Sequence, residues 1–519
     1  MTRVALALLP FVVALVAVPA PAADNKPTEL TKKLDALLDA PDYKHASWGA
    51  LVVDAKTGET VFARNPDALL APASVTKLFS CAAALVALGA DHRAETRVFQ
   101  RGIVIKGTLR GDLVLVAGGD LTLGGRAKGG KTLFGNKDHT YANGGTGTDL
   151  TDTDPLAGLN ELAKQVRAAG VTRVEGEVLV DERFFNRSRS SGSGPEVVSS
   201  IVVNDNVLDI IVTPSKTEGE PAKVTTRPET AFFQVDSAVS TGGAKAEANV
   251  QVLAVSATQV AVRGTVPAGG KEQVRVFGVD DPNLYARALF VEALRRNGVN
   301  AQCVVQRPAH TNLPERSLYE KLPKLATFES EPLKDTLAVV LKVSHNLYAS
   351  ALPSKVAAAK ANPNVEFGLR EERRILNELG VDTNAISFGG GAGGASADHV
   401  SARATVQLIS GMAKRDDWPA YKAALPVLGQ DGTLAEIGTD GPARGKVFAK
   451  TGTLIWYDVA NGRYLLKSKA LAGTMTTKGG RDLHFALFVN NVPLPEGVTA
   501  TREGKALGKV CEVLYEHAP

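Results

Sequence analysis

The sequence predicts a multi-domain α/β protein in which one domain, built from both ends of the chain, is interrupted by a β-rich insertion. At 519 residues the chain is longer than a single hydrophobic core ordinarily supports. It opens with two strand patterns and a helix pattern, and strands return near its end after a helical region. Between them, short β-like runs separated by Gly-, Asn- and Asp-rich turns fill residues 95 to 275.

The composition excludes several classes of protein. Hydrophobic residues make up 44% of the chain and charged residues 22%, which is typical of a soluble globular protein. The formal net charge of +4 is small for a chain of this size. It indicates neither the concentrated basic surface of a nucleic-acid-binding protein nor an acidic tail. No Cys/His cluster has the spacing of a zinc site. The sequence therefore indicates no metal, no organic cofactor and no nucleic-acid partner.

The first 22 residues have the pattern of a secretory signal peptide. Arg3 precedes an apolar run from Val4 to Val18, and Ala20-Pro21-Ala22 supplies small residues before a cleavage site after Ala22. A retained membrane anchor is the alternative, but Pro10 and the short apolar run favour cleavage. No later stretch approaches the ~18 apolar residues of a membrane helix. We expect an exported protein, periplasmic or associated with the cell envelope.

After this segment the elements follow in order. Leucines at helical spacing predict a helix before residue 45, and residues 48–63 alternate as a hairpin with its turn at Lys56-Thr57-Gly58. An apolar helix is expected over 74–89, where Gly89 ends it. The predicted strands that follow are 102–106, 112–117, 174–180, 206–212, 250–254 and 259–264.

Within this β-rich part, one helix is expected over 158–169, and the glycine-rich segment Gly124–Gly147 is expected to be a mobile loop. Asp138 and His139 would lie at its solvated tip rather than in a site. Further helical patterns cover 284–297, 332–360, 366–379, 401–414 and 502–515, with strands at 470–476 and 483–490.

The order of these elements predicts the domain boundaries. Residues 1–22 form the signal peptide, residues 23–94 plus 278–519 form one discontinuous domain, and residues 95–277 form the inserted β-rich domain or domains.

The first candidate chemical motif is Ser74-Val75-Thr76-Lys77, at the start of the apolar helix. Positions i and i+3 share a helix face, so the Lys77 amine can reach the Ser74 hydroxyl, which needs a nearby base to act as a nucleophile. A helix N-terminus also stabilises negative charge. Alone, the pattern is more often a helix cap beside a surface cation.

Two further motifs are also unremarkable when taken singly. Ser344-His345-Asn346 could be a turn or a helix cap. Lys450-Thr451-Gly452-Thr453 ends an alternating strand pattern, where the glycine would let a substrate backbone lie close.

Together, the three motifs are in the order found in penicillin-binding proteins and class A β-lactamases. Their spacing resembles that of the class C low-molecular-mass penicillin-binding proteins, the D-alanyl-D-alanine carboxypeptidase/endopeptidase family. The first two motifs are 270 residues apart (344 − 74) and the last two are 106 apart (450 − 344), whereas class A β-lactamases have a much shorter first interval. Other similar segments are Gly111–Asp120, Val203–Asp209, Leu428–Leu434, Lys469–Gly473 and Phe488–Asn491.

This resemblance implies a penicillin-binding transpeptidase/β-lactamase-like domain, an antiparallel sheet flanked by helices, with β-rich inserts. It implies that Ser74 attacks an acyl carbonyl of a peptidoglycan stem peptide and that Lys77 accepts its proton. Ser344 and Asn346 would pass protons and hold the substrate amide. β-Lactams would acylate the same serine as covalent inhibitors.

The resemblance also assigns the binding residues. Lys450 and Thr451 would meet the terminal carboxylate of the substrate, beside Gly452. Backbone N–H groups of Ser74 and Thr453 would form the oxyanion hole. The implied activity is that of a serine D-alanyl-D-alanine carboxypeptidase, with or without D,D-endopeptidase activity.

The sequence departs from the family pattern in three places. His345 replaces an aspartate and introduces a titratable ring, and Ser350 replaces an acidic residue. An Asp-Gly-Ser-Gly stretch of the family corresponds to Gly389–Gly393, which puts substrate contacts in doubt. Two alternatives stay open: a β-lactamase or esterase using the same serine, and a non-catalytic wall-binding protein.

The three cysteines, Cys81, Cys303 and Cys511, have apolar neighbours and are expected to be buried free thiols. A bridge between Cys303 and Cys511 is the alternative.

Overall fold

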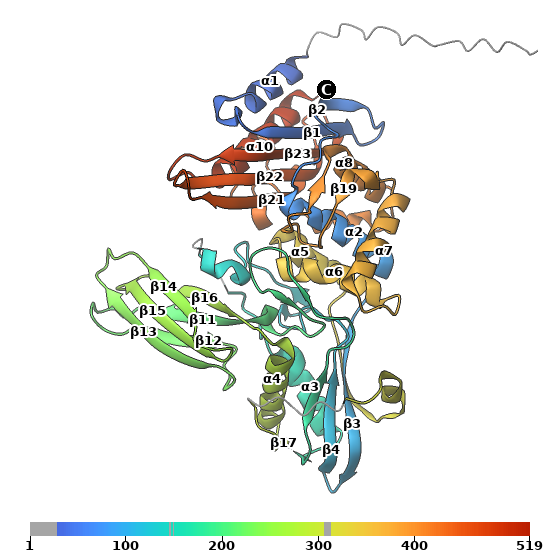
Figure 1. Ribbon diagram of the computed structural model, residues 1–519, viewed down its shortest axis with the longest axis vertical. Coiled ribbons are helices and arrows are strands. Elements are labelled where there is room, and N and C mark those ends of the chain that lie inside the picture. Colours follow the sequence, from blue (N-terminus) through green and yellow to red (C-terminus); the bar gives the residue numbers. More distant parts are fainter. Residues whose placement is uncertain (1–27, 145–146, 149, 306–312, 519) are drawn as a thin grey trace, which may run out of the picture.

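This computed structural model describes residues 28–518 except 145–146, 149 and 306–312. The predicted signal peptide, residues 1–22, lies outside the described residues. Among those residues, no helix combines the length and the apolar character that crossing a bilayer would require. The chain forms an elongated molecule with a helix-covered sheet at one end and the inserted sheets at the other (Figure 1).

The sheet at the first end is antiparallel and unites both ends of the chain. Its strand order is β2-β1-β23-β22-β21, so the third motif lies on an edge strand. The strands are β1 (Ser47–Asp54), β2 (Thr60–Arg64), β21 (Val447–Asp458), β22 (Arg463–Thr476) and β23 (Asp482–Pro493). Leucines of α1 (Glu29–Leu38) and α10 (Thr501–His517) cover one face and bury a shared core with it.

Helices on the other face form the second core and hold the first two motifs. At its centre lies α2 (Thr76–Leu88), in which ten consecutive residues from Thr76 to Leu85 are buried. Around it pack α5 (Leu333–Lys342), α6 (Asn346–Ala358), α7 (Val365–Glu378), α8 (Ala402–Met412) and α9 (Trp418–Ala423). The expected antiparallel sheet flanked by helices is confirmed.

The single helical pattern expected over 332–360 is two helices. They break at Val343–His345, where Ser344 has a φ of +65°, a left-handed conformation that a non-glycine residue adopts only at a cost. The second motif therefore lies in a turn between two buried helices.

Among its described residues, the inserted part contains three larger sheets and two α-helices. One sheet has the order β17-β7-β4-β3-β18, with β8 on β4; the others have the orders β12-β11-β16 and β13-β15-β14. The elements are β3 (Glu95–Ile105), β4 (Thr108–Val116), α3 (Ala157–Ala168), β7 (Arg173–Val174), β8 (Val178–Asp181), β11 (Val207–Thr213), β12 (Lys223–Arg227), β13 (Gln234–Gly242), β14 (Asn249–Ala254), β15 (Gln259–Pro267), β16 (Gln273–Gly278), α4 (Pro282–Arg296), β17 (Asn300–Ala301) and β18 (Lys324–Glu329).

Short strand pairs complete the fold. They are β5 (Ala127–Lys128) with β6 (Lys131–Thr132), β9 (Ser188–Arg189) with β10 (Val197–Val198), and β19 (Ile386–Ser387) with β20 (His399–Val400). The domain boundary at 277/278 stays a prediction. Because α4 shares the core of the insertion and β18 pairs with β3, the packing favours a return to the first domain near residue 330.

Within the segment Gly124–Gly147, the expectation of a solvated tip at Asp138 and His139 is wrong. The described part of this segment forms the β5–β6 pair and a 3₁₀ helix from His139 to Gly144. Asp138 and His139 are buried, and Arg126, also buried, pairs with Asp138 at 2.8 Å. Charge compensation makes this burial tolerable, and composition alone does not reveal it.

The cysteines are all free and buried, so Cys303 and Cys511 do not pair.

The buried position of Arg126 leads to a stability prediction. Arg126→Ala leaves the buried Asp138 without its ion pair and Asp205 paired with His139 but no longer with a guanidinium, and it is expected to destabilise the protein by about 3–5 kcal/mol. Arg189→Ala removes a pair with Glu196 whose side chains are largely exposed, and is expected to cost less than about 1 kcal/mol. Urea denaturation followed by circular dichroism compares the two variants. Equal shifts of the midpoint would contradict this account of Arg126.

Candidate active site

The proposed nucleophile lies in a tight turn wedged against the edge strand. Ser74 is in a 3₁₀ turn, Ala73–Val75, that leads into α2, and Ala73 has a φ of +47°. A Cβ atom on Gly452 of β21 would lie 2.5 Å from the carbonyl oxygen of Pro72. The space left by the missing side chain of Gly452 is therefore filled by the protein's own turn. This turn packs directly against the third motif.

The amine of Lys77 is fixed by three acceptors from three segments. Its Nζ donates to Ser74 Oγ at 2.8 Å, to Asn346 Oδ1 at 2.7 Å and to the carbonyl oxygen of Ala392 at 2.7 Å. The side chain is fully buried, and this burial lowers the pKa of Lys77 to about 7. An amine that is partly neutral near pH 7, in contact with a hydroxyl, can accept its proton.

A second buried amine serves the middle motif. Lys450 Nζ donates to Ser344 Oγ at 3.0 Å and to the carbonyl oxygen of Thr451 at 2.8 Å. Burial, and then the proximity of Lys77, hold the pKa of Lys450 well below its usual range. Ser344 thus contacts one lysine and Asn346 the other, so the structure brings the three predicted motifs together.

The threonines of the third motif contact two residues that lie outside the three motifs, Thr433 and Lys469. Thr451 Oγ1 donates to Thr433 Oγ1 at 2.7 Å, and Lys469 Nζ donates to Thr453 Oγ1 at 2.8 Å. Burial lowers the pKa of Lys469 to about 8. Both new residues lie in segments that carried the family resemblance, 428–434 and 469–473, which is the signal that could have found them.

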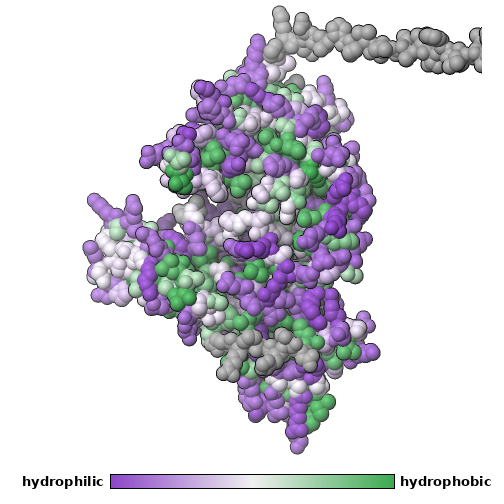
Figure 2. All heavy atoms as spheres, in the orientation of Figure 1, coloured by the Kyte–Doolittle hydropathy of each residue, from purple (hydrophilic) through white to green (hydrophobic). Residues whose placement is uncertain are grey.

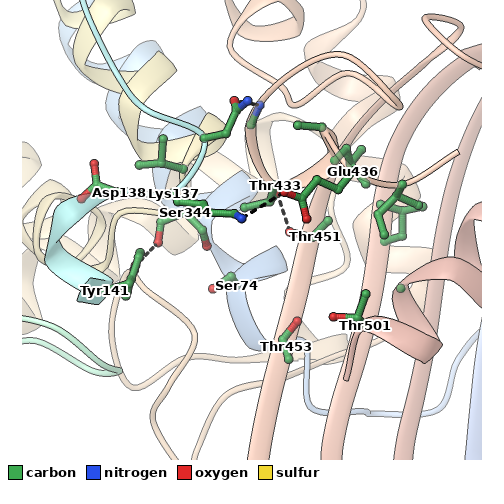
Figure 3. Close-up of a pocket in the computed structure, with 18 of the residues that line it drawn as sticks. Ser74, Lys137, Asp138, Tyr141, Ser344, Thr433, Glu436, Thr451, Thr453 and Thr501 are labelled. Carbon is green, nitrogen blue, oxygen red and sulfur yellow. Dashed lines mark hydrogen bonds and ion pairs between the residues drawn. The ribbon is translucent and has the colours of Figure 1, made fainter. Parts of the chain in front are cut away.

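These side chains line a cavity of about 440 Å³ that runs from Ser74 past β21 to α10 (Figure 3). The predicted site residues on its wall are Ser74, Ser344, Asn346, Thr451 and Thr453. The inserted part supplies Lys137, Asp138, Tyr141 and Ser193, of which Lys137 forms an ion pair with Glu436 at 3.1 Å. The insertion is therefore part of the site.

Two hydrogen bonds from the insertion hold the middle motif directly. Tyr141 donates through its hydroxyl to the carbonyl oxygen of Ser344 at 2.6 Å (Figure 3). Asn346 Nδ2 donates to the carbonyl oxygen of Ser193 at 2.9 Å. Nothing in the sequence around Tyr141 or Ser193 indicated these contacts, because both residues come from glycine- and serine-rich loops.

A buried charged cluster lies behind the same motif. His139 contacts Asp205 and Asp209, each at 2.6 Å, and Tyr348 of α6 donates to Asp205. Although burial alone would lower it, the two carboxylates raise the pKa of His139 to about 10. His345 stacks on Tyr348 with ring centroids 3.8 Å apart.

Three residues of this cluster have ligand atoms close enough to share a metal ion: Asp138, His139 and Asp205. The guanidinium of Arg126 already lies between the two carboxylates and supplies the balancing positive charge.

The altered glycine stretch contacts the site through its backbone. Cβ atoms on Gly391 and Gly393 would lie 2.1 Å and 1.9 Å from the carbonyl oxygens of Ala349 and Ala73. Ala392 contacts Lys77 through its carbonyl oxygen, so the change of side chain leaves that contact intact. Ser350, the other departure, is buried beside Ser190 at 3.1 Å.

Comparison with solved structures shows the fold. Penicillin-binding protein 4 of Haemophilus influenzae superposes with a TM-score of 0.70 at 21% identity, covering 94% of this chain and 100% of that chain. The same protein complexed with a β-lactam gives a TM-score of 0.66 at 20% identity, covering 94% and 99% of the two chains.

Comparison with known sequences shows the family. A D-alanyl-D-alanine carboxypeptidase of Actinomadura sp. (strain R39) is 31% identical over 451 residues, covering 82% of this chain and 77% of its own. A carboxypeptidase of Mycobacterium tuberculosis (strain ATCC 25618 / H37Rv) is 25% identical, covering 92% of this chain and 84% of its own. The sequence profile of the D-Ala-D-Ala carboxypeptidase 3 (S13) family matches residues 30–509, and this chain belongs to that family.

Proposed function

We propose that this protein is an exported serine D-alanyl-D-alanine carboxypeptidase, also able to act as a D,D-endopeptidase, that cleaves peptidoglycan stem peptides through an acyl-enzyme on Ser74. The observation that carries the proposal is the Lys77 amine, 2.8 Å from Ser74 Oγ and with a pKa lowered to about 7 by burial. Membership of the S13 family and the carboxypeptidases among its relatives support the substrate class. The predicted signal peptide supports export.

The contacts support the following course for acylation. Ser74 Oγ attacks the carbonyl of the penultimate D-alanine while Lys77 Nζ takes its proton. The backbone N–H groups of Ser74 and Thr453 stabilise the oxyanion, an effect worth about 3–4 kcal/mol for one donor in a well-studied hydrolase. Ser344, which contacts Lys450, gives its hydroxyl proton to the departing amine and takes up the proton that Lys77 removed from Ser74, so that both residues end acylation as they began it. Water then takes the place of that amine and releases the acyl group.

Substrate orientation is assigned to the third motif. The carboxylate of the departing D-alanine is placed against Lys450 and the hydroxyl of Thr451, which Thr433 orients. A carboxylate here offsets the unfavourable burial of the Lys450 amine. A β-lactam, whose amide is equivalent to the scissile bond, would occupy the same position; the β-lactam complex of the Haemophilus protein supports β-lactam binding.

The first test concerns the nucleophile. Wild-type protein incubated briefly with benzylpenicillin is expected to gain the mass of one drug molecule by intact-mass spectrometry, and Ser74→Ala is expected to gain none. Ser256→Ala, a change on the distant β14–β15 turn, should label as the wild type does. Labelling of Ser74→Ala would refute the assignment. Rapid drug hydrolysis without peptide cleavage would indicate the β-lactamase alternative instead.

The second test concerns the base. Because burial lowers the pKa of Lys77 to about 7, the neutral amine that accepts a proton predominates above that pH. The acylation rate constant for penicillin is therefore expected to rise about tenfold for each unit of pH below 7 and to level off above it. Stopped-flow measurement of acylation against pH provides the check. A rate independent of pH across this range would argue against Lys77 as the base.

The third test concerns the support from the insertion. Tyr141→Phe removes the hydroxyl that holds the strained Ser344 turn and is expected to lower the acylation rate constant about tenfold with little change in melting temperature. Tyr319→Phe removes a comparable buried hydroxyl contact, at 2.7 Å to Asp181, away from the cavity. If both variants acylate equally fast, Tyr141 has no positioning role.

A further inference from the structure

The hairpin that continues β21 into β22 exposes an unusual number of large apolar side chains. They are Ile455, Trp456, Tyr457, Val459 and Tyr464, and Trp456 is 68% exposed. Figure 2 shows apolar side chains at the end of this hairpin, beside a recess that separates it from the inserted sheets (Figures 1 and 2). An exposed cluster of this kind marks a binding surface more often than chance.

The direction of the substrate leads to this hairpin. In the proposed function, the departing carboxylate lies at Lys450 and Thr451, and the reacting carbonyl lies at the N–H of Thr453. The rest of the acyl-donor peptide must therefore continue along β21 beyond Thr453. Because β21 is the edge strand of its sheet, its free edge can pair with an extended peptide.

The distance along the strand fits the length of a stem peptide. Trp456 follows Thr453 by three residues, which places it about 10 Å further along an extended strand. An extended donor peptide spans the same distance with about three residues. The end of the stem peptide that is joined to the glycan therefore arrives at the hairpin.

The two faces of the hairpin differ. Side chains alternate along β21, so Trp456 shares the face of Lys450 and Gly452, which is turned toward Ser74. The bulge near Leu454 does not disturb this alternation, because the extra residue lies in β22. Tyr457 is on the opposite face, where its ring makes an edge contact with Tyr464 at 5.2 Å.

We infer that Trp456 forms a subsite for the sugar that carries the donor stem peptide, so that the enzyme recognises glycan-linked peptides over free ones. The inference rests on the proposed function. The electron-rich face of an indole attracts the polarised C–H groups of a pyranose ring. The turn beyond it exposes Val459 but also carries Asp458 and Asn461, which hydrogen-bond to each other. These polar groups at the tip of the hairpin favour a ligand lying along the strand over insertion into a membrane.

The test compares one peptide with and without its sugar. D-Alanine release is measured from a stem pentapeptide and from the same pentapeptide linked to the N-acetylglucosamine–N-acetylmuramic acid disaccharide. Trp456→Ala is expected to lower kcat/KM about tenfold for the disaccharide peptide and less than about twofold for the free peptide. Trp456→Phe should retain most of the preference. Tyr457→Ala, which removes an exposed ring from the opposite face, should leave both values unchanged.

The outcomes separate the subsite from the proposed function. Loss of activity on both substrates in Trp456→Ala, or no change on either, overturns the subsite while penicillin labelling of Ser74 stands. A wild type that releases D-alanine from neither peptide overturns the proposed function itself. Sedimentation with phosphatidylglycerol vesicles that depends on Trp456, with an unchanged sugar preference, would assign the hairpin to a membrane and overturn the inference.

Discussion

The site depends on one buried amine. Lys77 is fully buried, yet its three hydrogen bonds reach the turn that carries Ser74, the start of α6 and the glycine stretch at Ala392. Three segments that are far apart in the chain must be in place before this amine has all three of its hydrogen-bond acceptors. The same burial that makes the position demanding also shifts the pKa of Lys77 toward neutrality, so packing and chemistry come from a single constraint.

The insertion contributes to that constraint from the other side of the cavity. The middle motif occupies a turn between α5 and α6 with a left-handed residue, a conformation that needs support from its surroundings. Support comes from Tyr141 and Ser193, and from the charged cluster around Asp205 that reaches Tyr348. A long insertion between the first two motifs is therefore compatible with a compact site, because it folds back onto the second motif.

Much of the fold and the core of the site followed from the sequence, for identifiable reasons. Long amphipathic segments such as α7 and α10 show a clear helical period in their apolar residues. The three motifs are short segments whose residues act together. The break at Ser344 was missed because both flanking helices are apolar and read as one pattern. Asp138 and His139 were placed in solvent because their partners, Arg126, Asp205 and Asp209, come from distant positions that no local pattern connects. Thr433 and Lys469 lie within segments that carried the family resemblance, but the resemblance of a whole segment does not show which of its side chains contact the third motif.

The second buried lysine has a consequence for how ligands bind. In the described part of the chain Lys450 forms no ion pair with a carboxylate, and its amine is surrounded by Ser344, the Thr451 carbonyl and the nearby charge of Lys77. A ligand carboxylate entering the cavity raises the affinity of this amine for a proton. Binding of an anionic ligand is then coupled to proton uptake from solvent, and the enzyme's affinity for its substrate becomes linked to the acidity of the compartment in which it works.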